Sequence, residues 1–122
     1  MHNTKILKII FDRTDGHCHF CGDTIFFKKY GLKNVSDTAG VWEADHIKQK
    51  GKGGTKSAAN CLPACYRCNR LRWHRKGDDI RELLFLGLIT QEQIRKKNKI
   101  GAELIKLKEK RLHNNKKRRR SL

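Results

Sequence analysis

WEADHI at residues 42–47 and NCLPACYRCN at residues 60–69 are the two stretches that decide the fold of this chain. The first predicts a strand over about residues 41–47 that leads to the carboxylate of Asp45 and the imidazole of His46. The second begins at Asn60, contains a Cys-x-x-Cys pair and ends at Asn69. We expect a short strand near residues 61–62, with Pro63 at its end or on an edge, and then a helix to about residue 75.

Two Cys-x-x-Cys pairs bracket the Asp-His dipeptide, namely Cys18 with Cys21 and Cys65 with Cys68. Such a pair lets two thiolates bind one tetrahedral zinc ion at about 2.3 Å, so two pairs complete a structural site. A redox dithiol or four ordinary core cysteines is the alternative, but the βαβ context of a thioredoxin-like motif is missing. The fifth cysteine, Cys61, is expected to be a small buried hydrophobic residue.

Composition and charge narrow the class of partner. The chain has 122 residues, a net charge of +17 and a pI near 10.1, which predicts one small domain that binds a polyanion such as nucleic acid. No stretch approaches the roughly 20 apolar residues of a spanning helix, so we expect no membrane partner. An odd number of cysteines and the lack of a secretory signal predict an intracellular, reducing compartment: cytoplasm or nucleoid, or a eukaryotic nucleus.

Three segments are expected along the chain: a zinc-stapled domain over residues 1–77, a helical basic extension over 78–115 and a disordered basic tail over 116–122. A helix capped by Thr4 is predicted within residues 1–16, and a strand is one reading of residues 25–27. In the extension we expect a helix over 80–86 that Gly87 ends, a second short helix beginning at Thr90, and an amphipathic helix through Ile100.

The polar residues of the two deciding stretches fit metal-assisted hydrolysis. The neutral imidazole of His46 can accept a proton from water near physiological pH. A carboxylate at Asp45 and amide oxygens are ligands that hard ions such as Mg²⁺ or Mn²⁺ prefer. Each residue also has an ordinary reading as a surface histidine, a turn cap or a polar helix residue, so the inference depends on their order along the chain.

That order resembles the HNH endonuclease family: a helix, a cysteine pair, Asp-His, Gly-Gly, Asn, a second cysteine pair and Asn. The resemblance covers about residues 5–76 and implies an α+β chain with a small ββα-metal module stapled by structural zinc. It implies that Asp45 and Asn69 bind the catalytic Mg²⁺ or Mn²⁺, that His46 is the general base and that Asn60 orients His46. The last position is Asn69 instead of His, and Trp73 follows four residues later, so a three-histidine site is not expected.

Function is therefore expected to be metal-dependent cleavage of DNA by a one-metal mechanism. A non-catalytic zinc-stapled DNA-binding protein, an inactive form of the same fold and a ribonuclease are the alternatives. Double-stranded DNA is the expected partner, and a homodimer through the C-terminal helices is a further hypothesis. The basic residues expected to contact phosphate are Lys48, Lys50, Lys52, Arg67, Arg70 and Arg72.

Overall fold

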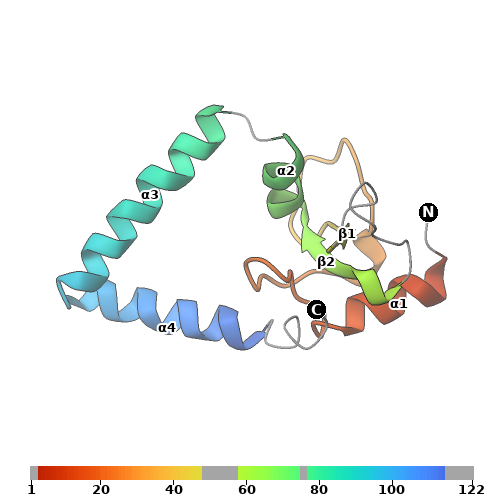
Figure 1. The fold of residues 1–122 in the computed structure, drawn as a ribbon, viewed down its shortest axis with the longest axis horizontal. Coiled ribbons are helices and arrows are strands. Elements are labelled where there is room, and N and C mark those ends of the chain that lie inside the picture. The colour runs from red at the N-terminus through yellow and green to blue at the C-terminus, as the bar shows by residue number, and fades with distance from the viewer. Residues whose placement is uncertain (1–2, 48–57, 75–76, 115–122) are drawn as a thin grey trace.

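The computed structural model describes residues 3–47, 58–74 and 77–114, although the side chains of residues 73 and 74 are excluded. These ranges hold a two-stranded antiparallel sheet and four α-helices, which confirms the α+β class (Figure 1). The elements in chain order are α1 (Thr4–Asp12), η1 (Phe27–Lys29), β1 (Trp42–His46), η3 (Ala58–Asn60), β2 (Cys61–Cys65), α2 (Tyr66–His74), α3 (Gly77–Arg95) and α4 (Lys99–Asn114).

Helix α1 is amphipathic, and its N-cap lies one residue before the predicted cap. Asn3, not Thr4, is the N-cap, because the Asn3 side chain accepts a hydrogen bond from the Ile6 backbone N–H at 2.9 Å. The predicted cap was therefore wrong, although both residue types serve this role. Ile10 lies on the inward face and is fully buried, so α1 packs against the sheet side of the molecule.

The sheet places the two deciding stretches side by side. In β1 and β2, Trp42 is opposite Cys65 and His46 is opposite Cys61. Pro63 lies in the middle of β2, opposite Ala44, and is tolerated because both strands of a two-stranded sheet are edge strands. The Pro63 carbonyl accepts a hydrogen bond from the His19 N–H at 2.9 Å, which ties the first cysteine pair to β2.

The core forms around Trp42, which is fully buried. Its indole N–H donates to the Phe26 carbonyl at 3.0 Å, and the ring of Tyr30 lies 4.8 Å away, edge-on. Ile10 and Ile25 complete the buried cluster with Cys61. The strand considered for residues 25–27 is wrong, because only an isolated bridge between His17 and Thr24 and the 3-10 helix η1 form there.

The extension is a hairpin of two long helices. Two short helices were predicted around Gly87, but α3 continues through this residue from Gly77 to Arg95. Strong helix formers on both sides of Gly87 outweigh its intrinsic cost of about 1 kcal/mol. The predicted final amphipathic helix is α4, which Asn98 caps by accepting a hydrogen bond from the Gly101 N–H at 2.7 Å.

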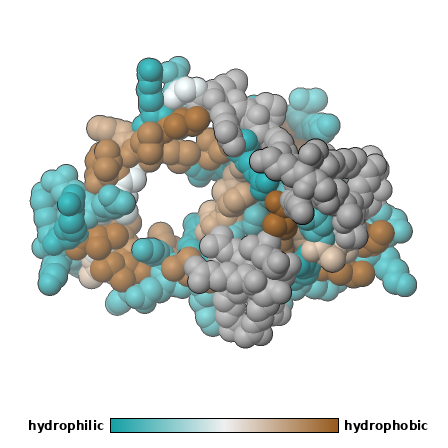
Figure 2. Space-filling model, viewed as in Figure 1, coloured by the Kyte–Doolittle hydropathy of each residue, from teal (hydrophilic) through white to brown (hydrophobic). Residues whose placement is uncertain are grey.

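Helix α4 returns to the first cysteine pair (Figure 1). The Arg111 guanidinium donates to the Cys21 carbonyl at 3.2 Å, and the Asn114 amide donates to the Gly22 carbonyl at 3.2 Å. Figure 2 shows an opening between this hairpin and the rest of the molecule. Within the three described ranges, no helix is long and apolar enough to cross a membrane. The predicted tail over residues 116–122 lies outside these ranges.

Candidate functional site

The four paired cysteines meet at one point, where the end of β2 and the start of α2 approach the first pair. The sulfur atoms of Cys18, Cys21, Cys65 and Cys68 all lie within 4.8 Å of one another. The distance between the Cys21 and Cys65 sulfurs is 3.8 Å, which is about the edge of a tetrahedron with a central bond of about 2.3 Å. The predicted clustering as in a zinc site is confirmed.

Hydrogen bonds among the four sulfurs shift the pKa values of these cysteines in opposite directions. Hydrogen bonds from Cys18, Cys65 and Cys68 lower the pKa of Cys21 well below its ordinary value. Hydrogen bonding to Cys18 and then to Cys21 raises the pKa of both Cys65 and Cys68. Four thiols at this distance from one another are a suitable ligand set for a divalent metal, which stabilises all four as thiolates.

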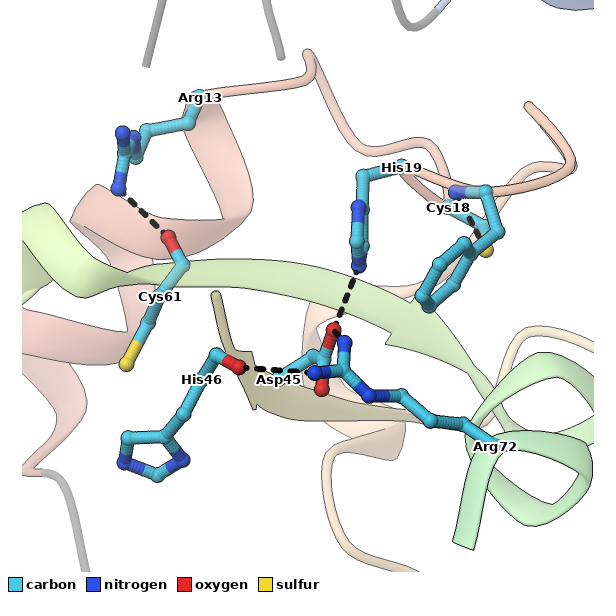
Figure 3. A network of polar contacts seen from close by, with 8 residues as sticks. Arg13, Cys18, His19, Asp45, His46, Cys61 and Arg72 are labelled. Carbon is cyan, nitrogen blue, oxygen red and sulfur yellow. Dashed lines mark hydrogen bonds and ion pairs between the residues drawn. The ribbon is translucent and has the colours of Figure 1, made fainter. Parts of the chain in front are cut away.

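A second cluster consists of Asp45, His19 and Arg72. Asp45 is its buried centre, with a relative exposure of 1%. Its Oδ2 accepts a hydrogen bond from His19 Nε2 at 2.9 Å and another from the Arg72 guanidinium at 2.5 Å (Figure 3). Its Oδ1 is buried and accepts no hydrogen bond from any of the described residues. A buried carboxylate oxygen without a partner is costly, and a hard cation would relieve that cost, so the residues present fit a bound divalent ion.

His46 ends β1 and is half-buried. Successive side chains of a strand point to opposite faces, and Figure 3 shows the His46 imidazole pointing away from Asp45 and His19. The His46 carbonyl accepts a hydrogen bond from Arg72 at 3.3 Å. The structure thus places the imidazole and the carboxylate at the same end of β1 but on different sides of it.

The two asparagines of the predicted site belong to different elements. Asn60 ends η3 beside His46, because its carbonyl accepts a hydrogen bond from the Ile47 N–H at 2.8 Å. Asn69 lies on α2, half-buried and three residues before Arg72. Residues three apart share a helix face, so Asn69 lies on the same side of α2 as Arg72, whose guanidinium contacts Asp45.

This arrangement can be compared with known proteins. The family model described as HNH endonuclease matches residues 18–75. The match identifies an HNH endonuclease domain at residues 18–75. The matched range begins at the first cysteine of the cluster, includes β1, β2 and α2, and ends before α3. Comparison with curated proteins and with solved structures gives no match. An HNH domain indicates nuclease activity on nucleic acid and metal binding.

The basic residues expected at the nucleic acid fall into three groups. Lys48, Lys50 and Lys52 lie outside the described residues. Arg67 and Arg70 are exposed on α2 of the HNH domain, and the Arg70 guanidinium lies 5.2 Å from the centre of the Tyr66 ring. Arg72 is the exception, because its side chain is only 23% exposed and contacts Asp45.

Sequence reasoning missed the partners of the HNH motif. The His19 ring contacts Asp45, while the His17 ring lies 3.0 Å from the Thr14 carbonyl. Arg13 follows α1 and reaches the η3–β2 junction. Its guanidinium lies 2.6 Å from the Ala58 carbonyl, and the further carbonyls within reach are those of Ala59 at 2.9 Å and Cys61 at 2.6 Å. The position of His19 between two cysteines was the only signal for its role.

Proposed function

We propose that this protein is a metal-dependent endonuclease that hydrolyses phosphodiester bonds in DNA, with one divalent ion and His46 as the general base. The observation that carries the proposal is the buried Asp45 carboxylate within an HNH domain: Oδ2 accepts hydrogen bonds, and Oδ1 accepts none from the part of the chain that the structure describes. Asp45 and Asn69 would hold Mg²⁺ or Mn²⁺. Such an ion, when bound, polarises the phosphate and stabilises the departing oxygen.

The proposed step divides the work between His46 and Asp45. In displacement at phosphorus the attacking and leaving oxygens lie roughly in line, on opposite sides of the reacting atom. His46 would take the proton of the attacking water, while the ion that Asp45 would hold would serve the leaving oxygen. We propose that Asn60, whose carbonyl accepts a hydrogen bond from the Ile47 N–H beside His46, orients the His46 ring.

Charge supports a nucleic acid substrate. The net charge of +17 favours binding to a polyanion, and Arg67 and Arg70 are exposed on α2 next to the site. Arg72 contributes a positive charge beside Asp45, where a phosphate oxygen would sit. We propose double-stranded DNA as the substrate and zinc as the ion of the four-cysteine cluster.

Cleavage of supercoiled plasmid is the direct test. Wild-type protein, His46→Ala and the control His113→Ala would be incubated with EDTA, Mg²⁺ or Mn²⁺. His113 is exposed on α4, outside the HNH domain, so its variant should cut like wild type. We expect His46→Ala to lose at least about 100-fold in rate, because a general base contributes about 10²–10⁴-fold, with zinc content unchanged. Full activity in His46→Ala would refute the role of the base.

The same assay separates the rival functions. A non-catalytic DNA-binding protein would retard the plasmid in a salt-sensitive manner and leave it intact with every metal ion. A ribonuclease would cut an RNA duplex of the same sequence and spare the DNA. Cleavage of DNA by wild type that requires added metal would exclude both.

A homodimer is a second part of the proposal, and helix α3 supports it. None of the α3 side chains is buried, and three large apolar ones, Leu84, Phe85 and Leu88, are each more than 60% exposed. Figure 2 shows apolar surface along both helices of the hairpin. Four carboxylates against two arginines give α3 a net charge of −2, whereas α4 is basic, so two copies of the hairpin complement each other in charge.

Sedimentation would test the dimer. Wild type should sediment as a dimer, whereas Phe85→Glu should be a monomer because the charge would be buried in the interface. A monomeric wild type, with and without DNA, would refute this part of the proposal and leave the catalytic part unaffected.

A further inference from the structure

The first cysteine pair reaches into the catalytic end of the HNH domain through His19. This residue stands between Cys18 and Cys21, and its side chain is 7% exposed. Three contacts fix it: the backbone N–H donates to the Pro63 carbonyl at 2.9 Å, the ring lies 4.0 Å from that of Phe20, and Nε2 lies 2.9 Å from Asp45 Oδ2. A histidine held in this way can control the orientation of the carboxylate it touches.

We propose that His19 is a positioning residue that holds Asp45 Oδ2, so that Oδ1 is presented to the catalytic metal ion. The inference rests on the proposed function. An aspartate carboxylate rotates about its last side-chain bond, and either oxygen can then face a ligand. The hydrogen bond from His19 favours one orientation, so a metal ion meets a ligand that has already lost its rotational freedom.

The same contact links the two metal sites of the protein. Because Cys18 and Cys21 flank His19, the ion that fixes their sulfurs also fixes the backbone from which His19 reaches Asp45. Arg72 shares Oδ2, but its removal would also delete a positive charge beside the metal. Substitution of Arg72 would therefore mix two opposite effects, and His19 is the residue to change.

The test is Mn²⁺ binding to the zinc-loaded full chain, measured by electron paramagnetic resonance titration alongside zinc content. The variants are His19→Leu, which removes the donor, and His19→Gln, whose amide can replace it. His17→Gln is the matched control, because His17 belongs to the same segment but contacts Thr14 and not Asp45. Asp45→Asn identifies the Mn²⁺ that binds at the site. If His19→Leu loses zinc, the shorter His19→Asn replaces it.

We expect His19→Leu to bind Mn²⁺ about 10- to 100-fold more weakly, with one zinc retained, and His19→Gln to recover most of the affinity. An unchanged affinity in His19→Leu would overturn the inference and leave the proposed function intact. An equal loss in His17→Gln would also overturn it, because the effect would then come from the cysteine segment as a whole. If wild type bound no Mn²⁺ that depends on Asp45, the proposed function and the inference would fail together.

Discussion

Arg13 anchors the segment that contains Asn60 by hydrogen bonds to its backbone carbonyls. It belongs to the turn after α1, yet its guanidinium reaches carbonyl oxygens at both ends of the η3–β2 junction. Burial lowers the pKa of Arg13, with an opposing effect from Cys61. The group remains charged at neutral pH, since an arginine begins far above that range. Hydrogen bonds from a charged donor are among the stronger ones in proteins.

Arg13→Met should therefore lower the free energy of unfolding by about 1–3 kcal/mol, because partly buried carbonyls lose their donor. It should also slow cleavage, since Asn60 loses its anchor. Lys8→Met on the same helix is the control, as the Lys8–Asp12 pair is more than half exposed and contributes little. Urea unfolding followed by circular dichroism measures the stability of both variants, and the plasmid assay measures their cleavage. Equal stability of the two variants would contradict the role of Arg13.

At the scale of single residues, the sequence predicted which residues form the cysteine cluster more readily than which side chains contact Asp45. The four cysteines were predicted from spacing alone, because a Cys-x-x-Cys turn limits where two thiolates can point. The contact between His19 and Asp45 spans 26 positions and depends on the approach of the first pair to β2, which no local pattern encodes. The same holds for Arg72, whose partner lies 27 positions away.

The helical hairpin depends on close approach at one glycine. A Cβ built on Gly101 would lie 2.3 Å from the Gln93 carbonyl oxygen, near the end of α3. A Cβ on Gly87, in the middle of α3, would meet nothing within 4 Å. Two glycines in one hairpin thus have opposite roles: Gly101 allows the backbones to touch, and Gly87 only costs helix propensity.

Gly101→Ala should destabilise the hairpin by about 1–3 kcal/mol, as overpacking does. Gly87→Ala should stabilise it by about 0.5–1 kcal/mol, because alanine favours a helix and no neighbour must move. Both changes would be measured as thermal loss of the helical signal at one protein concentration, which keeps any dimer equilibrium comparable. The same sign for both variants would contradict the close approach.

Among the elements, β1 and α2 were predicted more accurately than α3. The strand over 41–47 and the helix after Cys65 were predicted within one or two residues, because each lies between chemically distinct neighbours. Gly87 misled the prediction of α3, since glycine ends a helix only where the chain turns away. Here the flanking leucines and Phe85 continue the helical pattern through it.

Across the whole molecule, the four-cysteine cluster joins parts that are distant in sequence. It joins the segment after α1 to the β2–α2 junction, and α4 rests on the same segment through Arg111 and Asn114. Structural zinc in small peptides contributes on the order of 10–16 kcal/mol of apparent binding energy. That exceeds or matches the net stability of an ordinary domain, about 5–15 kcal/mol.

Cys68→Ser should therefore abolish cooperative thermal unfolding and reduce the zinc content well below one ion per chain. Cys61→Ala is the control: Cys61 is fully buried in the core but is not one of the clustered cysteines, so zinc should remain. Atomic emission for zinc and far-ultraviolet circular dichroism give the two readings. A Cys68→Ser protein with an unchanged melting temperature would contradict the role of the metal as a staple.

The hydrogen bond between the Ile47 N–H and the Asn60 carbonyl joins the two ends of the segment that separates His46 from Asn60. With β1 and β2 paired directly beyond it, both ends of that segment are anchored at one place. Lengthening a loop whose ends are already fixed costs little, because loop entropy grows only slowly with length. A change of length between residues 48 and 57 should therefore leave Asp45, His46 and Asn60 where they are.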